Sequence, residues 1–296
     1  MELCLGTVQL GLKYGITGNE QPSISQSIHM LEYAFEKGIR CLDTAIAYGT
    51  AEEVVGTFIK GNPQYINEVK LITKLPLSIF KDNPVDKWSD LVKASIEQSL
   101  KRLGVNQLGA CMLHSPDLIT DPRVIECLYA VKEFGYAKRV GASVYTPGQA
   151  FELVKLSNME TIQIPYNIFD QRLNQTDFFA HVKERPIEIY ARSAFLQGLI
   201  LMEANKIPDY ISGAKEIVST FHSLCKQQNL SRMDVAINFV KKNKQIDYLV
   251  FGVDNLGQLK EFIEHYSIDI PENKIACIAQ QFYNIDERIV MPNLWK

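Results

Sequence analysis

The chain has 296 residues, of which 46% are hydrophobic and 22% charged, a composition that excludes disordered and fibrous classes. Its net charge of −3 provides no basic excess for nucleic-acid or membrane-surface binding, and no apolar run approaches the ~20 residues that span a bilayer. The first residues lack the basic flank and apolar stretch of a signal peptide. Six scattered cysteines form no Cys-x-x-Cys pair, and the histidines show no metal-ligand spacing. We expect reduced core cysteines, no metal site and a cytoplasmic protein.

Short apolar runs alternate with longer amphipathic stretches along the whole chain. The runs are rich in Val, Ile, Leu or Cys, as is typical of strands covered on both faces. The expected strands are 3–8, 40–43, 69–74, 107–114, 139–144, 161–164, 188–191 and 248–251. The expected helices are 25–37, 85–103, 124–134, one opened by Thr146 and Pro147, 231–242 and 255–263. Further helical segments lie within 202–228 and 271–285.

This alternation predicts a parallel sheet built from eight βα units with right-handed crossovers. An eight-stranded closed barrel fits that count, and its usual length is about 250 residues. A doubly wound open sheet is the competing fold, but residues 5–11 read LGTVQLG and lack its Gly-x-Gly-x-x-Gly motif. No linker interrupts the pattern, so we expect a single domain over residues 1–296, with an extra helix before the eighth strand and a C-terminal helix.

Four chemically active side chains are expected at the ends of consecutive strands. Asp43 ends the second strand, and Tyr48 follows it in the loop; Lys74 and His114 end the next two strands. Functional groups of such barrels lie at this rim. Each residue also has an ordinary interpretation, as a helix cap, a turn residue, a surface charge or a core histidine. Their occurrence at one rim favours a shared chemical role.

The residue types indicate proton transfer to a carbonyl oxygen. A free tyrosine has a pKa near ~10, which is too high for efficient proton donation at neutral pH. An ammonium from Lys74 lowers the pKa of the Tyr48 phenol, and Asp43 fixes that ammonium in place. The His114 imidazole can hydrogen-bond the carbonyl oxygen and orient it.

Three motifs resemble those of the aldo-keto reductases, in the order and spacing of that family. Residues 43–56 read DTAIAYGTAEEVVG and resemble its Asp-Thr-Ala…Tyr-Gly…Glu…Gly signature; residues 72–74 (ITK) and 113–117 (LHSPD) resemble its lysine and histidine strands. The resemblance runs nearly end to end. It implies a (β/α)8 TIM barrel that binds NADP(H), sometimes NAD(H), and reduces an aldehyde or ketone. It also implies a catalytic tetrad of Asp43, Tyr48, Lys74 and His114.

The resemblance also implies a set of cofactor-binding residues. Ser143 and Gln163 match residues that hold the nicotinamide carboxamide, although Val144 replaces the usual Asn beside Ser143. Arg192 stands at the ring-stacking position, where it could stack on the nicotinamide or meet an anionic substrate. The segment that covers the pyrophosphate contributes Ser193, Phe195, Gln197 and Gly198, and the adenosine-phosphate site contributes Gly252, Asp254 and Gln258.

Cofactor preference and substrate are less constrained by the sequence. Asp254 should repel the 2′-phosphate of NADPH. We therefore expect that NADH can serve as the cofactor as well as NADPH, which the family usually uses. Tyr14, Phe80 and Trp88 could form aromatic pocket walls and Arg172 could bind a carboxylate or phosphate, but each could equally be ordinary packing. Residues 5–11 and 291–295 resemble a bacterial branch associated with sugar and surface-polysaccharide metabolism.

We therefore expect a small carbonyl substrate and a monomer or weak oligomer. Two other functions remain possible from the sequence. One is a cofactor-binding module of the same fold with little turnover. The other uses Lys74 as a Schiff-base nucleophile; pairing with an aspartate argues against it, because the amine then stays protonated.

Overall fold

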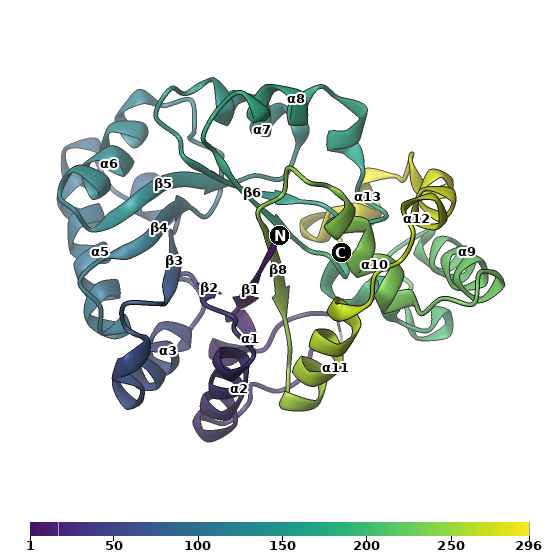
Figure 1. The fold of residues 1–296 in the computed structure, drawn as a ribbon. Helices are drawn as coiled ribbons and strands as arrows, with labels where there is room; N and C mark the ends of the chain where they lie inside the picture. Colours follow the sequence, from purple (N-terminus) through teal and green to yellow (C-terminus); the bar gives the residue numbers. More distant parts are fainter. Residues whose placement is uncertain (17, 296) are drawn as a thin grey trace.

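The computed structural model describes residues 1–16 and 18–295 and forms a closed barrel of eight parallel strands (Figure 1). The strands follow one another around the barrel in chain order, and β1 closes it by pairing with β8. Their bounds are β1 (Glu2–Gly6), β2 (Cys41–Asp43), β3 (Lys70–Leu75), β4 (Leu108–Leu113), β5 (Ala137–Ser143), β6 (Thr161–Pro165), β7 (Glu188–Arg192) and β8 (Tyr248–Gly252). The barrel predicted from the sequence is confirmed.

Helices surround the barrel (Figure 1). Those that connect consecutive strands are α2 (Ile24–Glu36), α3 (Ala51–Gly61), α5 (Trp88–Leu103), α6 (Pro122–Glu133), α7 (Pro147–Lys155), α8 (Phe178–Lys183) and α10 (Arg232–Lys242), and α11 (Leu256–Ser267) follows β8. The predicted additional helices are α9 (Ala214–Gln227) and α12 (Glu272–Ala279). The short helices are α1 (Val8–Gly11), α4 (Ser78–Lys81) and α13 (Glu287–Val290). Within the described residues, no helix is both long and apolar enough to cross a membrane.

Local sequence signals place several helix ends correctly. Thr146 caps α7: its hydroxyl accepts the Gln149 N–H, and the Gln149 side chain accepts the Thr146 N–H. Gly104 ends α5 with a φ of 70°, a left-handed conformation that glycine adopts without strain. Val8 departs from expectation. It begins α1 instead of extending β1, because the chain turns at Thr7, whose carbonyl accepts the Leu10 N–H.

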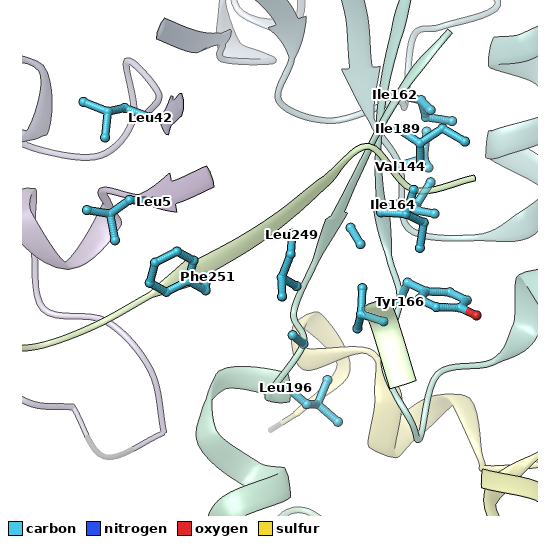
Figure 2. Packing of buried hydrophobic residues seen from close by; sticks show 14 of the residues in the cluster. Leu5, Leu42, Val144, Ile162, Ile164, Tyr166, Ile189, Leu196, Leu249 and Phe251 are labelled. Carbon is cyan, nitrogen blue, oxygen red and sulfur yellow. The ribbon is translucent and has the colours of Figure 1, made fainter. Parts of the chain in front are cut away.

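Side chains alternate between the inside of the barrel and the layer beneath the helices. In β8, Tyr248 and Val250 belong to the interior cluster, whereas Leu249 and Phe251 pack in the outer layer (Figure 2). Low in the barrel, the rings of Tyr190 and Tyr248 stack with centroids 4.5 Å apart. Side chains therefore fill the barrel interior towards the amino ends of the strands, and the candidate functional groups lie at the carboxyl ends. Most cysteines are buried, but Cys277, expected in the core, is exposed.

Candidate active site

A cavity of about 980 Å³ opens at the carboxyl ends of the strands. One part of its wall contains Asp43, Tyr48 and His114, and another contains Asp254 and Gln258. Lys74 lies behind this wall, with 1% of its surface exposed. The cavity is thus large enough for a dinucleotide-sized ligand and a small second molecule, with the four candidate catalytic residues grouped together.

Asp43 and Lys74 form a buried ion pair beneath the cavity. Lys74 Nζ lies 2.6 Å from Asp43 Oδ1 and also donates to the Thr44 carbonyl at 3.0 Å. Burial lowers the pKa of Lys74, but the Asp43 carboxylate together with Tyr48 and Cys4 more than offsets this, and the net pKa of the amine is raised. Lys74 therefore carries a fixed positive charge at neutral pH.

Tyr48 and His114 face each other above this pair. Their ring centroids are 5.4 Å apart with planes at 82°, and Lys74 Nζ lies 5.1 Å from the Tyr48 ring centroid. Burial raises the pKa of Tyr48, and the ammonium of Lys74 lowers it only in part. The net shift is therefore opposite to the one expected from the sequence, because the cavity wall desolvates the phenol. At neutral pH, Tyr48 is protonated and able to donate.

His114 is neutral at physiological pH. Burial, reinforced by the charge on Lys74, lowers the pKa of His114 to about 4. A neutral imidazole still carries one N–H, which can donate to an oxygen that also receives the Tyr48 hydroxyl. The two side chains can thus bind one carbonyl oxygen without adding a second positive charge beside Lys74.

Two glycines fix the loop that carries Tyr48. A Cβ on Gly11 would lie 1.8 Å from the Tyr48 carbonyl oxygen, and a Cβ on Gly49 would lie 2.2 Å from the Gly11 carbonyl oxygen. Gly49 also has a φ of 55°. The close approach lets the Thr50 N–H donate to the Gly11 carbonyl. Helix α1 and the Tyr48 loop therefore interlock through their backbones.

A buried carboxylate ties the neighbouring elements together. Glu52, at the start of α3, accepts the Thr73 hydroxyl at 2.6 Å and Arg102 Nε at 2.7 Å. Thr73 immediately precedes Lys74 in β3, and Arg102 belongs to α5. Glu52 thus joins the helix that follows Tyr48 to the strand that carries Lys74.

Each residue expected to bind the cofactor lines the cavity. This set comes from the ends of β5 to β8 and the loops that follow them: Ser143, Gln163, Arg192, Ser193, Phe195, Gln197, Gly198, Gly252, Asp254 and Gln258. Gln163 has a further contact, since its Nε2 donates to Asp43 Oδ1 at 2.9 Å.

The loop after β7 has an unusual backbone. Ser193, Leu196 and Gln197 are non-glycine residues with φ values of 63°, 48° and 55°, and Gly198 follows at 94°. Such strain is concentrated at ligand sites, and successive left-handed residues can turn backbone N–H groups towards an anion. Within the loop, the Leu196 and Gly198 N–H groups already donate to the Ser193 and Phe195 carbonyls, so the expectation that this segment covers a pyrophosphate stays a prediction.

Asp254 is held at the far end of the cavity by a long-range contact. Asn19 Nδ2 donates to Asp254 Oδ2 at 2.6 Å, and Gln258 Nε2 donates to the same oxygen at 3.3 Å. The Asp254 N–H donates in turn to Gln258 Oε1. The segment after β1 therefore contacts the loop after β8, the strand paired with β1, at the edge of the cavity, and no sequence motif indicates this contact.

Residues 2–281 match the model of the Aldo/keto reductase family. The chain belongs to the aldo/keto reductase family. It is 28% identical to aldo-keto reductase YhdN of Bacillus subtilis (strain 168) over 260 residues, which cover 80% of this chain and 78% of that protein. It is 23% identical to D-threo-aldose 1-dehydrogenase of a Pseudomonas species, over 85% of this chain and 86% of that one. The holo form of aldo-keto reductase AKR11C1 from Bacillus halodurans superposes with a TM-score of 0.76 at 20% identity, covering 98% of this chain and 95% of that one.

In this aldo/keto reductase, the expected substrate-pocket residues have different positions. Tyr14 lines the cavity. Phe80 and Trp88 are buried and pack edge to face with ring centroids 5.3 Å apart, outside the cavity lining. Arg172 is also outside it, because Asp170 and Glu287 hold its guanidinium at 2.7 and 3.0 Å. Of the four residues expected in the substrate pocket, Tyr14 is therefore the one that lines the cavity.

Other lining residues of the aldo/keto reductase were not singled out from the sequence. They include Gln9, Asn19, Tyr145, Arg232, Glu261, His265 and Asn293. The buried Oε1 atom of Gln9 has no hydrogen-bond partner. In the sequence, Gln9 is marked only by its position shortly after β1 and Thr7. A bound ligand would supply the missing hydrogen-bond donor to Gln9 Oε1.

Proposed function

We propose that this aldo/keto reductase reduces the carbonyl group of a small aldehyde or ketone to an alcohol, using NADPH or NADH. The observation that carries the proposal is that Tyr48, His114 and Asp43 line one part of the cavity wall while Lys74, paired with Asp43, lies directly behind it. The reduced nicotinamide would supply the hydride that bonds to the carbonyl carbon. The proton that bonds to the carbonyl oxygen can then be assigned to a residue of the chain.

Tyr48 is the proposed proton donor. Its O–H bond breaks as the carbonyl oxygen takes the proton, and the phenolate left behind faces the Lys74 ammonium. That charge stabilises the phenolate, because an opposite charge within a few ångströms favours the ionised form. His114 donates to the same oxygen and orients it, and solvent later returns a proton to Tyr48.

The buried ion pair argues against a Schiff base at Lys74. A nucleophilic lysine must lose its proton. Asp43 instead raises the pKa of Lys74 against the effect of burial. The name of the Pseudomonas relative, D-threo-aldose 1-dehydrogenase, supports sugars as the first substrates to test.

The test follows absorbance at 340 nm with NADH and NADPH against a panel of aldoses, sugar phosphates and aromatic aldehydes. Tyr48→Phe should lower kcat by ~10² or more, because a positioned acid contributes ~10²–10⁴. Its dinucleotide affinity should stay unchanged. Tyr283→Phe, which alters an exposed tyrosine (45% exposed), is the matched control. Cofactor binding without turnover of any carbonyl would indicate a binding module instead.

A further inference from the structure

Arg192, at the end of β7, is a positively charged side chain with no acidic partner. Its Nε, Nη1 and Nη2 atoms donate to Ser143 Oγ, Ser193 Oγ and the Val144 carbonyl at 3.3, 3.2 and 2.9 Å. All three acceptors are uncharged. Among the described residues, no carboxylate lies within 4.0 Å of its guanidinium. Since Asp43 and Lys74 neutralise each other, Arg192 gives this end of the cavity a net positive charge.

The hydrogen bonds hold the guanidinium in a fixed orientation. A guanidinium donates hydrogen bonds in its own plane. Because the N–H groups of Arg192 donate to acceptors at the end of β5 and in the loop after β7, the two flat faces of the guanidinium remain available for stacking. The Tyr145 ring takes up one such contact, with its centroid 4.8 Å from the central carbon of Arg192. Arg192 is thus arranged as a stacking surface in the cavity wall.

The chemistry of the site places a nicotinamide ring beside this surface. Tyr48 and His114 define the position of the carbonyl oxygen, and reacting atoms must approach to about 3–3.5 Å. The ring must therefore occupy the same part of the cavity. Ser143 and Gln163, paired in register on β5 and β6, offer a hydroxyl and an amide to its carboxamide. Arg192 Nε donates to Ser143 Oγ. In the strand register, Arg192 in β7 is the partner of Pro165 in β6, two residues after Gln163.

We propose that Arg192 makes the site discriminate between the two redox states of the cofactor, by placing a fixed positive charge against the nicotinamide ring. The oxidised ring carries a positive charge and the reduced ring is neutral. Like charges a few ångströms apart repel, more strongly where water is excluded. The site therefore binds the reduced dinucleotide better than the oxidised one. This inference rests on the proposed function and assigns Arg192 to the cofactor instead of to an anionic substrate.

The test measures the dissociation constants of NADH, NAD⁺ and their phosphorylated counterparts by fluorescence and calorimetry, without substrate. The quantity compared between variants is the dissociation constant of the oxidised dinucleotide divided by that of the reduced dinucleotide. Arg192→Gln keeps a planar hydrogen-bonding group but removes the charge, and should lower this ratio about tenfold, which corresponds to ~1.4 kcal/mol. Arg192→Lys keeps the charge and should keep the ratio within about threefold. Circular dichroism and thermal unfolding confirm that each variant is folded.

Lys206→Gln is the matched control, because Lys206 is a cavity-lining cation outside the catalytic group. It should change the affinities of both redox forms by the same factor. An unchanged ratio in Arg192→Gln, with a raised KM for carboxylate- or phosphate-bearing carbonyls, would overturn the inference and assign Arg192 to the substrate. An unchanged ratio with intact turnover overturns the inference but leaves the proposed function standing. If the wild-type protein binds neither redox form, both proposals fail.

Discussion

Gln163 Nε2 donates to Asp43 Oδ1 at 2.9 Å, the same carboxylate oxygen that receives Lys74 Nζ at 2.6 Å. The sequence predicts that Gln163 binds the cofactor, and in the structure it also donates to the carboxylate that holds the Lys74 ammonium. The two donors reach Asp43 from different sides, since Lys74 lies in β3, the strand paired with β2, whereas Gln163 lies in β6, which is not adjacent to β2. The proposed carboxamide site and the proposed proton-transfer site therefore share one hydrogen-bond network.

Removal of this glutamine donor should destabilise the protein. Gln163→Leu takes a hydrogen bond from a buried charged group, for which we expect a loss of about 1.5–3 kcal/mol in the free energy of unfolding, measured in urea. Gln163→Glu places a second carboxylate against Asp43. Its stability should fall further at pH 8 and recover towards pH 5 as the new carboxyl is protonated. Equal stability of the two variants across this range would show that the Gln163–Asp43 contact is absent in solution.

Loss of the Asp43 charge should impair both folding and activity. Asp43→Asn leaves Lys74 buried without its counter-ion, and breaking a buried pair costs about 3–5 kcal/mol. Activity should fall as well, because the amine is no longer held against Tyr48. The control is Glu20→Gln in the exposed Lys13–Glu20 pair, which should change stability by less than about 1 kcal/mol. Chemical denaturation of both variants provides the comparison, and similar losses in the two would contradict the prediction.

His114 should make stability depend on pH below neutrality. Its pKa is lowered to about 4 in the folded protein by burial, whereas an unfolded histidine titrates near ~6.5. The unfolded chain therefore binds the additional proton first, so stability is lost as the pH falls from about 6.5 to about 4. The loss should reach up to about 3 kcal/mol at the lower limit. Thermal unfolding of the wild type and His114→Asn across this range measures it; parallel curves would refute the assignment.

Asp254 should weaken the preference for NADPH. Two unit charges ~6 Å apart interact by roughly 3 kcal/mol at an effective dielectric near 20, and solvent and salt should reduce this to ~1 kcal/mol. Lys260 does not compensate, because its amine lies over the Tyr33 ring, 5.4 Å from the centroid. We expect kcat/KM values for NADH and NADPH within about tenfold of each other.

Asp254→Ser should shift that ratio towards NADPH, and more strongly at low salt. Asn19→Ala is the matched variant, because it removes the 2.6 Å hydrogen bond but keeps the carboxylate. It should leave the sign of the preference unchanged. A wild-type preference for NADPH above a thousandfold, unaffected by Asp254→Ser, would show that the carboxylate does not reach the nucleotide.

The sequence predicts those features that local patterns encode. Thr146 and Gln149 form their capping box within one turn of helix, so the start of α7 can be predicted from adjacent residues. Asp43 and Lys74 fall at or near the carboxyl ends of strands and Tyr48 follows in a loop, and a closed parallel barrel brings these ends to one rim.

Features that depend on distant contacts could not be predicted in this way. The sequence predicts Arg172 as a group that binds a carboxylate or phosphate, but Asp170, two residues away, and Glu287, 115 residues away, both pair with it once the chain is folded. Asn19 meets Asp254 across 235 residues, a contact that no local pattern encodes. The raised pKa of Tyr48 likewise depends on how the folded cavity wall excludes water, which outweighs the nearby ammonium that the sequence does indicate.

The interlock of Gly11 and Gly49 has a consequence for redesign of the substrate pocket. Because a Cβ on either residue would overlap the other segment's backbone, residues 7–11 and 48–51 cannot be exchanged separately for loops from another barrel. A graft that replaces one segment alone would move Tyr48 by the distance needed to relieve the overlap. Libraries that aim to change substrate range should therefore transplant the two segments as one unit, or vary only the side chains that face the cavity.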